Sequence, residues 1–357
     1  MSANDSQLSE RLQTGFLGVI AFALLLFLLV QARFMLTCLA FSIIIFSLTS
    51  DAISAFARLR VPNWLATTLA LIAIAIALLW AATTVVAQVN EVVSTSILYA
   101  DRAQATILSL SQRWGPRVQE SILTFLGGID FAGWIRSAAS QASNLISGSV
   151  LVLTFVGFMF AERIWFPVKV ERLTGDPARA TEVLRIIHSI MRRVNRYLVV
   201  KAAISAVTAA LIWVIFRSAG LELSGAVATL SFILNFIPTI GSIIATVIAI
   251  AVVLAQTGDP TTTLAIGSAC TAVHFLIGNI FDPMLLGQTL RLSSFGIVLA
   301  LAFWGAVWGI AGTFLAVPIM VAVMIVCAHI RWLRPLAVML SHEGLPEEEP
   351  PRPRLRG

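Results

Sequence analysis

The feature that most constrains this chain is a late apolar stretch, Gly278–Met320, that is interrupted by helix breakers and polar side chains. The stretch is hydrophobic enough to lie in lipid, yet it contains Pro283, Pro318, Asn279 and Asp282. In the hydrocarbon core each unpaired backbone group costs several kcal/mol, so a broken helix is tolerated only against protein or a wet cavity. Transporters build binding sites from such interrupted helices. The pattern therefore favours a transport function.

An earlier stretch, Phe232–Ile244, has the same character, with Asn235, Pro238 and Gly241 at three-residue spacing in an apolar run. Proline leaves backbone carbonyls unpaired, glycine permits close approach, and asparagine offers both a donor and an acceptor. We expect these three residues to contact a small polar substrate or an ion. The alternative is a simple kink in which the asparagine satisfies the backbone. Asn279 has a similar setting, and we expect it to join the same substrate site together with Pro283.

Composition places the chain in a membrane. Of its 357 residues 58% are hydrophobic and 12% are charged, with a mean hydropathy of +0.92, whereas ordinary soluble domains carry about 25% charged residues. The net charge of +6 lies almost entirely in one connecting segment, so we expect no nucleic-acid partner. Enzyme motifs, cofactor fingerprints and metal-ligand spacings are absent, and the three cysteines fall in unrelated apolar runs. We predict a protein that is not an enzyme and needs no cofactor or metal.

Membrane spans need about 17 to 25 mainly apolar residues, and this requirement predicts an all-α polytopic membrane protein. We expect about six full transmembrane helices, two broken or re-entrant helical hairpins and a small extramembrane helical subdomain. In chain order, the predicted regions are a three-helix membrane region (1–88), a non-cytoplasmic amphipathic subdomain (89–143), a transmembrane helix (144–161), a basic cytoplasmic linker helix (162–197), a transport core (198–335) with broken segments at 223–257 and 293–330, and a disordered cytoplasmic tail (336–357). Each broken segment is either a hairpin or a pair of full spans. Halves of about 16 residues cover only ~24 Å, which favours hairpins.

The segment 162–201 sets the expected orientation, because it carries nine basic and four acidic residues. The positive-inside rule places it in the cytoplasm, and both termini with it. Asp176 followed by Pro177 predicts the start of a helix. The apolar stripe of that helix either faces anionic lipid headgroups or packs on the protein itself.

Asp282 is the most suggestive carboxylate, since an ionisable group in a membrane segment is a functional candidate by default. The residue before proline disfavours helical backbone, so we expect a helix to stop there. Asp282 is then either a proton-coupling group or the N-cap of the next helix. The second role is suggested by the Asp-Pro dipeptide, which also occurs at Asp176 and Asp259. His274, two turns earlier, is a second coupling candidate or a hydrogen-bonded packing residue.

Small residues recur in the second broken segment. Gly305, Gly309 and Gly312 are three to four residues apart, as close helix contact requires, and Trp304 and Pro318 flank them. These residues either line a transport pathway or serve helix packing, including packing between subunits.

The sequence NFIPTIG from Asn235 to Gly241, the following Gly-Asn…Asp-Pro…Gly pattern and the sequence FWGAVWGIAGTFLAVP up to Pro318 resemble the autoinducer-2 exporter family of bacterial membrane transporters. The resemblance is strongest from Ser231 to Val323. It implies an inner-membrane exporter of small polar metabolites or signalling molecules, coupled to protons or ions, that works as a homo-oligomer, a pentamer, with an elevator-like movement. A departure is Gly278-Asn279, where the family leads us to expect an acidic residue nearby. The alternatives are a passive channel and a non-transporting scaffold that docks partners through residues 89–143.

Overall fold

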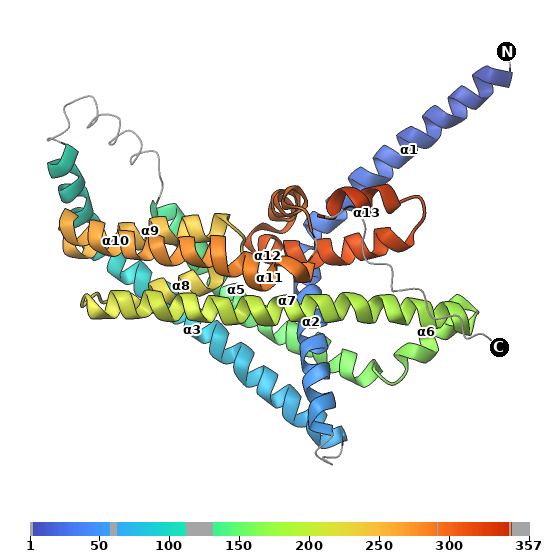
Figure 1. The fold of residues 1–357 in the computed structure, drawn as a ribbon, viewed down its shortest axis with the longest axis horizontal. Coiled ribbons are helices and arrows are strands. Elements are labelled where there is room, and N and C mark those ends of the chain that lie inside the picture. Colours follow the sequence, from blue (N-terminus) through green and yellow to red (C-terminus); the bar gives the residue numbers. More distant parts are fainter. Residues whose placement is uncertain (1–2, 58–62, 112–130, 291, 343, 345–357) are drawn as a thin grey trace. The chain divides into compact units, whose positions relative to one another are not determined.

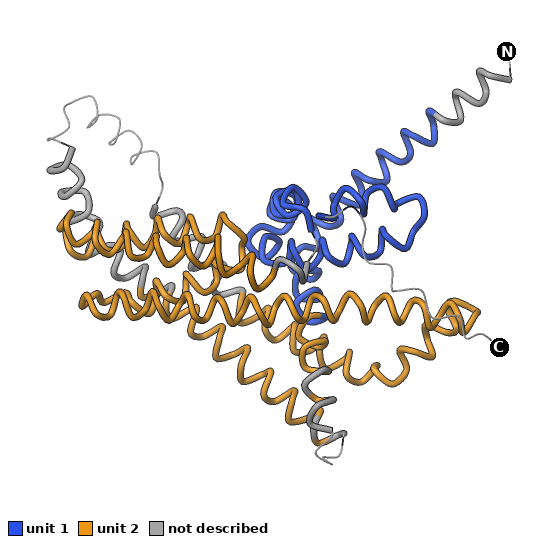
Figure 2. Tube along the Cα trace, in the orientation of Figure 1, with its two compact units in different colours: residues 1–43, 292–357 blue, residues 44–291 orange. Residues whose placement is uncertain are grey.

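A computed structural model describes residues 3–57, 63–111, 131–290, 292–342 and 344. These residues are overwhelmingly helical, and eight of the helices are long and apolar enough to cross a membrane. The prediction of an all-α polytopic membrane protein is thus confirmed. The chain divides into two compact units, residues 44–291 and residues 1–43 with 292–357, which Figure 2 shows in different colours. Each unit is described by itself.

The unit of residues 44–291 begins with the second half of α2 (Arg33–Ala57), and its described residues form eight further helices and one π-helical turn. In chain order these are α3 (Asn63–Ser111), α5 (Phe131–Glu162), α6 (Phe166–Thr174), α7 (Pro177–Ser218), α8 (Ser224–Leu234), α9 (Ile240–Thr257), α10 (Pro260–Leu276), the π-turn η1 (Ile277–Phe281) and α11 (Asp282–Leu290). Helix α3 packs against α5, and α7 packs against α6, α8, α10 and α11. Helix α7 is therefore the central element of this unit (Figure 1).

Two helices run across boundaries that the sequence analysis had drawn. Helix α3 continues beyond residue 88 to Ser111, and α7 joins the basic linker to the following span in one 42-residue helix. Neither helix contains a glycine or a proline after its first residue, so nothing in the backbone ends them earlier. Residues 112–130, in the predicted extramembrane subdomain, lie outside the described residues, as do residues 345–357 of the predicted tail.

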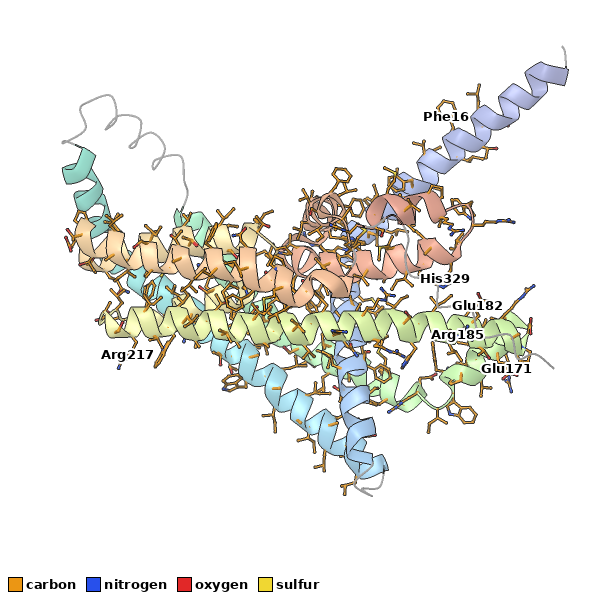
Figure 3. The ribbon with its side chains drawn as sticks, in the orientation of Figure 1. Phe16, Glu171, Glu182, Arg185, Arg217 and His329 are labelled. Carbon is orange, nitrogen blue, oxygen red and sulfur yellow. The ribbon has the colours of Figure 1, made fainter. Side chains whose placement is uncertain are left out.

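The start of α7 follows the predicted pattern. Asp176 is the N-cap, its side chain accepts a hydrogen bond from the backbone N–H of Ala178 at 2.9 Å, and Pro177 takes the first helical position. The two ends of this helix are polar: Figure 3 shows Glu182 and Arg185 near its start and Arg217 at its far end. The apolar part between them is a candidate membrane span.

A shared apolar core holds the later helices of this unit to α7. Its fully buried members include Ile212 and Phe216 of α7, Val253 of α9 and Cys270 of α10, with Val227 of α8 beside them. Because the side chains come from four helices, the core fixes α8, α9 and α10 against the C-terminal half of α7.

The other unit consists of α1 (Ala3–Gln31), the first half of α2, α12 (Ser294–His329) and α13 (Arg334–Leu340). The indole N–H of Trp308 donates to the carbonyl of Leu29 in α1 at 3.1 Å. The chain before α12 is tied to the end of α13, since the backbone N–H of Ser293 donates to the carbonyl of Leu340 at 2.8 Å. Helix α13 thus closes back on the start of α12.

Candidate functional site

The candidate site is built on one buried face of α7 that carries polar side chains. Tyr197, Lys201 and Ser205 follow one another at four-residue intervals, so they lie on the same side of the helix, and at most 2% of each residue is exposed. A buried polar group costs free energy unless a partner satisfies it. The partners of these three side chains therefore define the site.

Lys201 is paired with Asp282, the carboxylate that the sequence analysis singled out. The Lys201 Nζ lies 2.6 Å from Asp282 Oδ2, with 1% of the lysine side chain and 19% of the aspartate side chain exposed. The second carboxylate oxygen, Oδ1, is buried and has no hydrogen-bond partner among the described residues. Tyr197 also has a buried hydroxyl without a partner there. The pair thus has a neutral total charge but unused hydrogen-bonding capacity.

The helix does not stop at Asp282, so the expectation drawn from Pro283 is wrong. Asp282 has helical backbone angles, and its N–H donates to the carbonyl of Ile277 through the wide π-turn that joins α10 to α11. Proline clashes with the carbonyl four residues before it in a regular helix. The π-turn changes that spacing, and Pro283 falls in the first turn of α11, where no N–H is needed.

The alternative that Asp282 caps the next helix is also wrong. The capping role belongs to Asp259, which precedes α10: its carboxylate accepts the backbone N–H groups of Thr261 and Thr262. The Thr262 hydroxyl donates to it as well, at 2.6 Å. These hydrogen bonds hold the pKa of Asp259 below its usual value, with the hydroxyl as the largest cause. Asp282 instead uses its carboxylate to bind Lys201. One dipeptide thus has two different roles in this chain.

One turn beyond Lys201, α7 contacts the break in the first broken segment. Asn235 is the C-cap of α8, is 1% exposed, and donates from Nδ2 to the Ser205 hydroxyl at 3.0 Å. Its Oδ1 atom is buried and has no partner among the described residues. The asparagine is therefore a fixed donor whose acceptor oxygen is free, rather than a residue that only satisfies a kink.

The turn between α8 and α9 is tight and strained. Gly241 packs so closely that a Cβ atom there would lie 1.7 Å from the carbonyl oxygen of Leu234. At the tip, the Ile240 N–H donates back to the Pro238 carbonyl at 2.6 Å, and Thr239 between them has φ +62° and ψ −58°. This is a γ-turn geometry that a β-branched residue adopts only under strain. Strained backbone of this kind clusters at binding sites and at segments that switch conformation.

His274 connects α10 to α9. Its Nδ1 lies 3.0 Å from the Thr246 hydroxyl, it is 4% exposed, and its Nε2 has no partner among the described residues. Thr246 is one turn from Ser242, which in turn faces Gly278. These contacts fix an antiparallel register of α9 against α10 and the start of the π-turn.

The structure separates the two asparagines that we expected to act together. Asn279 is exposed, and its amide donates to the carbonyl of Phe275 in its own helix at 3.0 Å. Pro283 is exposed as well. Asn235, by contrast, is buried and bound to α7. A shared substrate contact of the two asparagines stays a prediction that this arrangement does not favour.

The predicted residues of the second broken segment belong to the other unit. The helical angles fail at Gly309, which has φ +63° and ψ −141°, and two helical segments meet at a kink there. A Cβ atom at Gly312 would lie 1.9 Å from the carbonyl oxygen of Trp304, and one at Gly305 would lie 2.8 Å from Thr313. The close approach that we expected of these glycines is thus made within the segment itself. Pro318 is buried inside the second half of α12.

Comparison with known proteins agrees with the membrane fold. Residues 17–332 match the family model described as the AI-2E family transporter. The chain belongs to this family.

The chain is similar to proteins of several bacteria. The AI-2 transport protein TqsA of Escherichia coli (strain K12) is 29% identical over 288 residues, which are 80% of this chain and 83% of TqsA. A protein of Haemophilus influenzae is 27% identical over 292 residues, with the same shares of the two chains. A protein of Borreliella burgdorferi is 30% identical over 221 residues, and that match spans 60% of this chain and 61% of the relative. The last two are named as transport proteins without a substrate. This family member is accordingly a multi-pass membrane protein of a transporter family.

Sequence reasoning missed the cation of the site. It counted Lys201 among the basic residues of the cytoplasmic linker, but the structure buries it inside the unit. The signal was present: Lys201 follows Leu198, where the predicted span begins, in the apolar sequence YLVVKAAISAV. A lone cation in a span pairs with a carboxylate, so Asp282 could have been matched to it. Tyr197, Ser205 and Thr246 carry no such signal. Among the described residues, no group of His, Cys, Asp and Glu has a metal-binding arrangement.

Proposed function

We propose that this protein is a carrier of small polar metabolites in the inner membrane and that its transport site lies between α7 and the α8–α11 elements. The observation that carries the proposal is the buried pair of Lys201 and Asp282 beside a broken helix. Replacing a buried ion pair by apolar residues of similar volume is often neutral or stabilising, so such a pair in a membrane segment needs a functional reason. The family membership supports the same conclusion.

The chemistry of the site suits a small polar substrate with hydrogen-bond donors together with a coupled proton or ion. The free Oδ1 atoms of Asn235 and Asp282 can accept hydrogen bonds, and the strained turn at Thr239 is exposed at its tip. Asp282 and Lys201 together form the coupling site in this proposal, because neutralising either one alters the charge of the other's surroundings. His274 is a weaker candidate, since Thr246 already binds one of its nitrogens.

We propose autoinducer-2 or a similar small signalling molecule as the substrate and export as the direction of transport. The supports are the name of the relative TqsA and the resemblance in the sequence from Asn235 to Pro318. The exposed arginines of α6 and the start of α7 favour a cytoplasmic position for this end of the helices. We also propose contact of this basic region with anionic headgroups, assembly as a homo-oligomer and an elevator-like movement, for which the breaks at 235–239 and at Gly309 supply flexible points.

The length of α8 bears on how the first broken segment crosses the bilayer. With 11 residues α8 extends about 17 Å at 1.5 Å per residue, little more than half of a ~30 Å hydrocarbon core. Helix α9 has 18 residues, or about 27 Å. We therefore propose that the chain turns inside the membrane at Asn235–Thr239, so that α8 does not cross the bilayer by itself and the broken segment returns to its side of entry.

The test is flux in reconstituted liposomes. Purified protein is placed in liposomes with a pH gradient and a lumenal pH indicator, and a panel of small polar metabolites that includes autoinducer-2 is offered. We expect saturable, substrate-dependent proton movement that Asp282→Asn abolishes. Asp259→Asn is the matched control, because it makes the same chemical change at a second Asp-Pro pair while asparagine still caps the helix.

Three outcomes would count against the proposal. Proton movement that survives Asp282→Asn would remove the coupling role of the ion pair. An ohmic single-channel current in place of saturable flux would indicate a passive channel. Absence of flux for every compound, from protein that melts cooperatively, would turn attention to the scaffold alternative.

A further inference from the structure

The Lys201–Asp282 pair is asymmetric in a way that assigns different roles to its two members. Lys201 is buried almost completely, and Asp282 is the one hydrogen-bond partner that the described structure gives its ammonium group. Asp282 is 19% exposed as a side chain, and its Oδ1 atom, although buried, has no donor among the described residues. The carboxylate therefore keeps a free acceptor beside the lysine, whereas the described structure gives the lysine no second partner.

We propose that Lys201 carries the coupled proton and loses it when the substrate displaces its ammonium group from Asp282. The substrate group that does so is a small organic cation with N–H donors, an ammonium or a guanidinium. This inference rests on the transport function proposed above and names the group that titrates in it. The Asp282 carboxylate already accommodates an ammonium group at 2.6 Å, that of Lys201. The group that best fits where an ammonium sits is another N–H cation, since carboxylates bind such donors through short, charge-assisted hydrogen bonds.

The exchange step balances in charge and protons. In the empty carrier the Lys201 ammonium occupies the Asp282 carboxylate. The cargo cation binds the carboxylate and displaces the ammonium, which has no other counter-charge and gives one proton to water, leaving a neutral amine. The site is neutral before and after the exchange. One cation enters the site for each proton that leaves it, so transport exchanges cations for protons one for one.

The alternative, in which Asp282 takes the proton, leaves a worse arrangement. A protonated Asp282 would strand the ammonium of Lys201 in a site where 1% of the side chain is exposed. Removing one partner of a buried pair in this way is strongly destabilising. Lysine is also the cation that proteins use when a buried group must lose its proton, which arginine does not do.

The surrounding elements add few groups that could take over the proton. Tyr197 on α7, one turn from Lys201, and His274 and Cys270 on α10 are the other titratable side chains on the buried faces that pack here. Helices α8 and α9 and the π-turn contain no charged residue, and α11 contributes only Asp282.

The experiment compares two variants of Lys201 in the same proteoliposomes. Lys201→Arg keeps a cation beside Asp282 but removes the ability to lose the proton. Lys201→Gln removes both the charge and the competition for the carboxylate. The matched controls are Lys169→Arg and Lys169→Gln, because Lys169 forms its ion pair with Glu162 on the exposed surface. All variants are first checked for cooperative thermal unfolding.

The probes are ethanolamine and guanidine, with choline as a cation that lacks N–H donors and sodium as an alkali ion. Passive entry of ethanolamine as the neutral base is subtracted with empty liposomes and with the Asp282→Asn protein. We expect ethanolamine and guanidine to drive proton exit in the parent and in both Lys169 variants. In Lys201→Arg the proton movement should fall to the level of empty liposomes. In Lys201→Gln radiolabelled guanidine should still cross, but without proton exchange and without dependence on pH.

Each other result overturns a stated part of the inference. Proton exchange that persists in folded Lys201→Arg would assign the proton to Asp282 while leaving the proposed transport function intact. Exchange driven by sodium or choline but not by ethanolamine or guanidine would refute the N–H cation. If neutral metabolites drive proton movement and none of the cations does, the inference fails although the proposed function stands. If no compound moves protons in the parent, both fail.

Discussion

The strongest structural prediction concerns the turn at Gly241. An alanine there would place its Cβ atom 1.7 Å from the Leu234 carbonyl oxygen and 2.7 Å from its carbon. Contacts under 3.0 Å are essentially never seen for real Cβ atoms, so the oxygen would have to move by more than an ångström. The clash is with the backbone of the same turn, not with the end of a flexible side chain. Relief thus requires that the turn between α8 and α9 opens.

The expected size of the effect follows from that geometry. Overpacking typically lowers the free energy of unfolding by about 1–3 kcal/mol and sometimes more. Because the clash at Gly241 is with rigid backbone, we expect a loss of about 3 kcal/mol for Gly241→Ala. At about 2.1 cal/mol/K of unfolding entropy per residue, this corresponds to a fall in Tm of roughly 4 °C for cooperative unfolding of all 357 residues. Opening the turn would also pull Asn235 from Ser205, so we expect transport to fall more steeply than the amount of folded protein.

The chain provides both the assay and the controls for this prediction. Its three cysteines, Cys38, Cys270 and Cys327, are free and buried, so a thiol-reactive fluorescent dye reports unfolding directly. Gly157→Ala in α5 is the control, because nothing lies within 4 Å of the added carbon and alanine favours a helix over glycine by about 1 kcal/mol. We expect this variant to melt at or above the parent temperature. Equal melting temperatures of Gly241→Ala and Gly157→Ala would refute the close contact in the turn.

Three further predictions concern single interactions in the same unit. Lys201→Met should lower the free energy of unfolding by about 3–5 kcal/mol, because it leaves a buried carboxylate without its partner. Adding Asp282→Asn should restore a large part of that loss. A double variant no more stable than Lys201→Met would disprove the energetic coupling of the two side chains. Ser205→Ala should lower the free energy of unfolding by about 1–3 kcal/mol, since it leaves the side-chain amide of Asn235 without its acceptor. Ser231→Ala should lower it less in the same thermal assay, because the Ser231 hydroxyl has no partner in the described structure. The pKa of Asp259 is lower in the folded protein, so its stabilisation of α10 is present above the usual pKa of an aspartate and is lost as the pH falls through the lower folded value. Amide hydrogen exchange at the start of α10 should accelerate in that acidic range. In Asp259→Asn the exchange should lose this pH dependence.

Much of the fold could be predicted from the sequence because membrane helices depend on length and apolar composition. The start of α7 at Pro177 and the break after Asn235 are confirmed, since capping residues and proline act locally. The second broken segment bends at Gly309, a position that we had assigned to helix packing or the pathway. Helix continuity was harder to predict. The polar residues after residue 88 resembled the start of a new subdomain, but α3 runs on to Ser111, because polarity does not end a helix in the absence of glycine or proline.

The candidate site was only partly predictable, for a different physical reason. Asp282 and Asn235 could be found because each is a polar residue beside a proline in an apolar run. Their partners on α7 depend on tertiary packing, and a hydroxyl such as that of Ser205 looks the same in the sequence whether it is exposed or buried. The π-turn before Asp282 is likewise a tertiary adjustment, which lets the helix continue past Pro283 where the local rule predicts an end.

The turn after α8 and the π-turn before α11 both meet α7 at its buried polar face, one turn apart. Ser205 holds the turn after α8 by one neutral hydrogen bond, and Lys201 holds the π-turn region by an ion pair. A neutral hydrogen bond contributes about 1 kcal/mol, whereas separating a buried ion pair costs about 3–5 kcal/mol. The hydrogen bond to the α8–α9 turn is therefore the weaker of the two polar contacts, although the apolar core also holds α8 and α9 against α7. In the transport function proposed above, the strained turn would yield first to the substrate, and the ion pair would respond once a ligand or a proton change compensates its two charges.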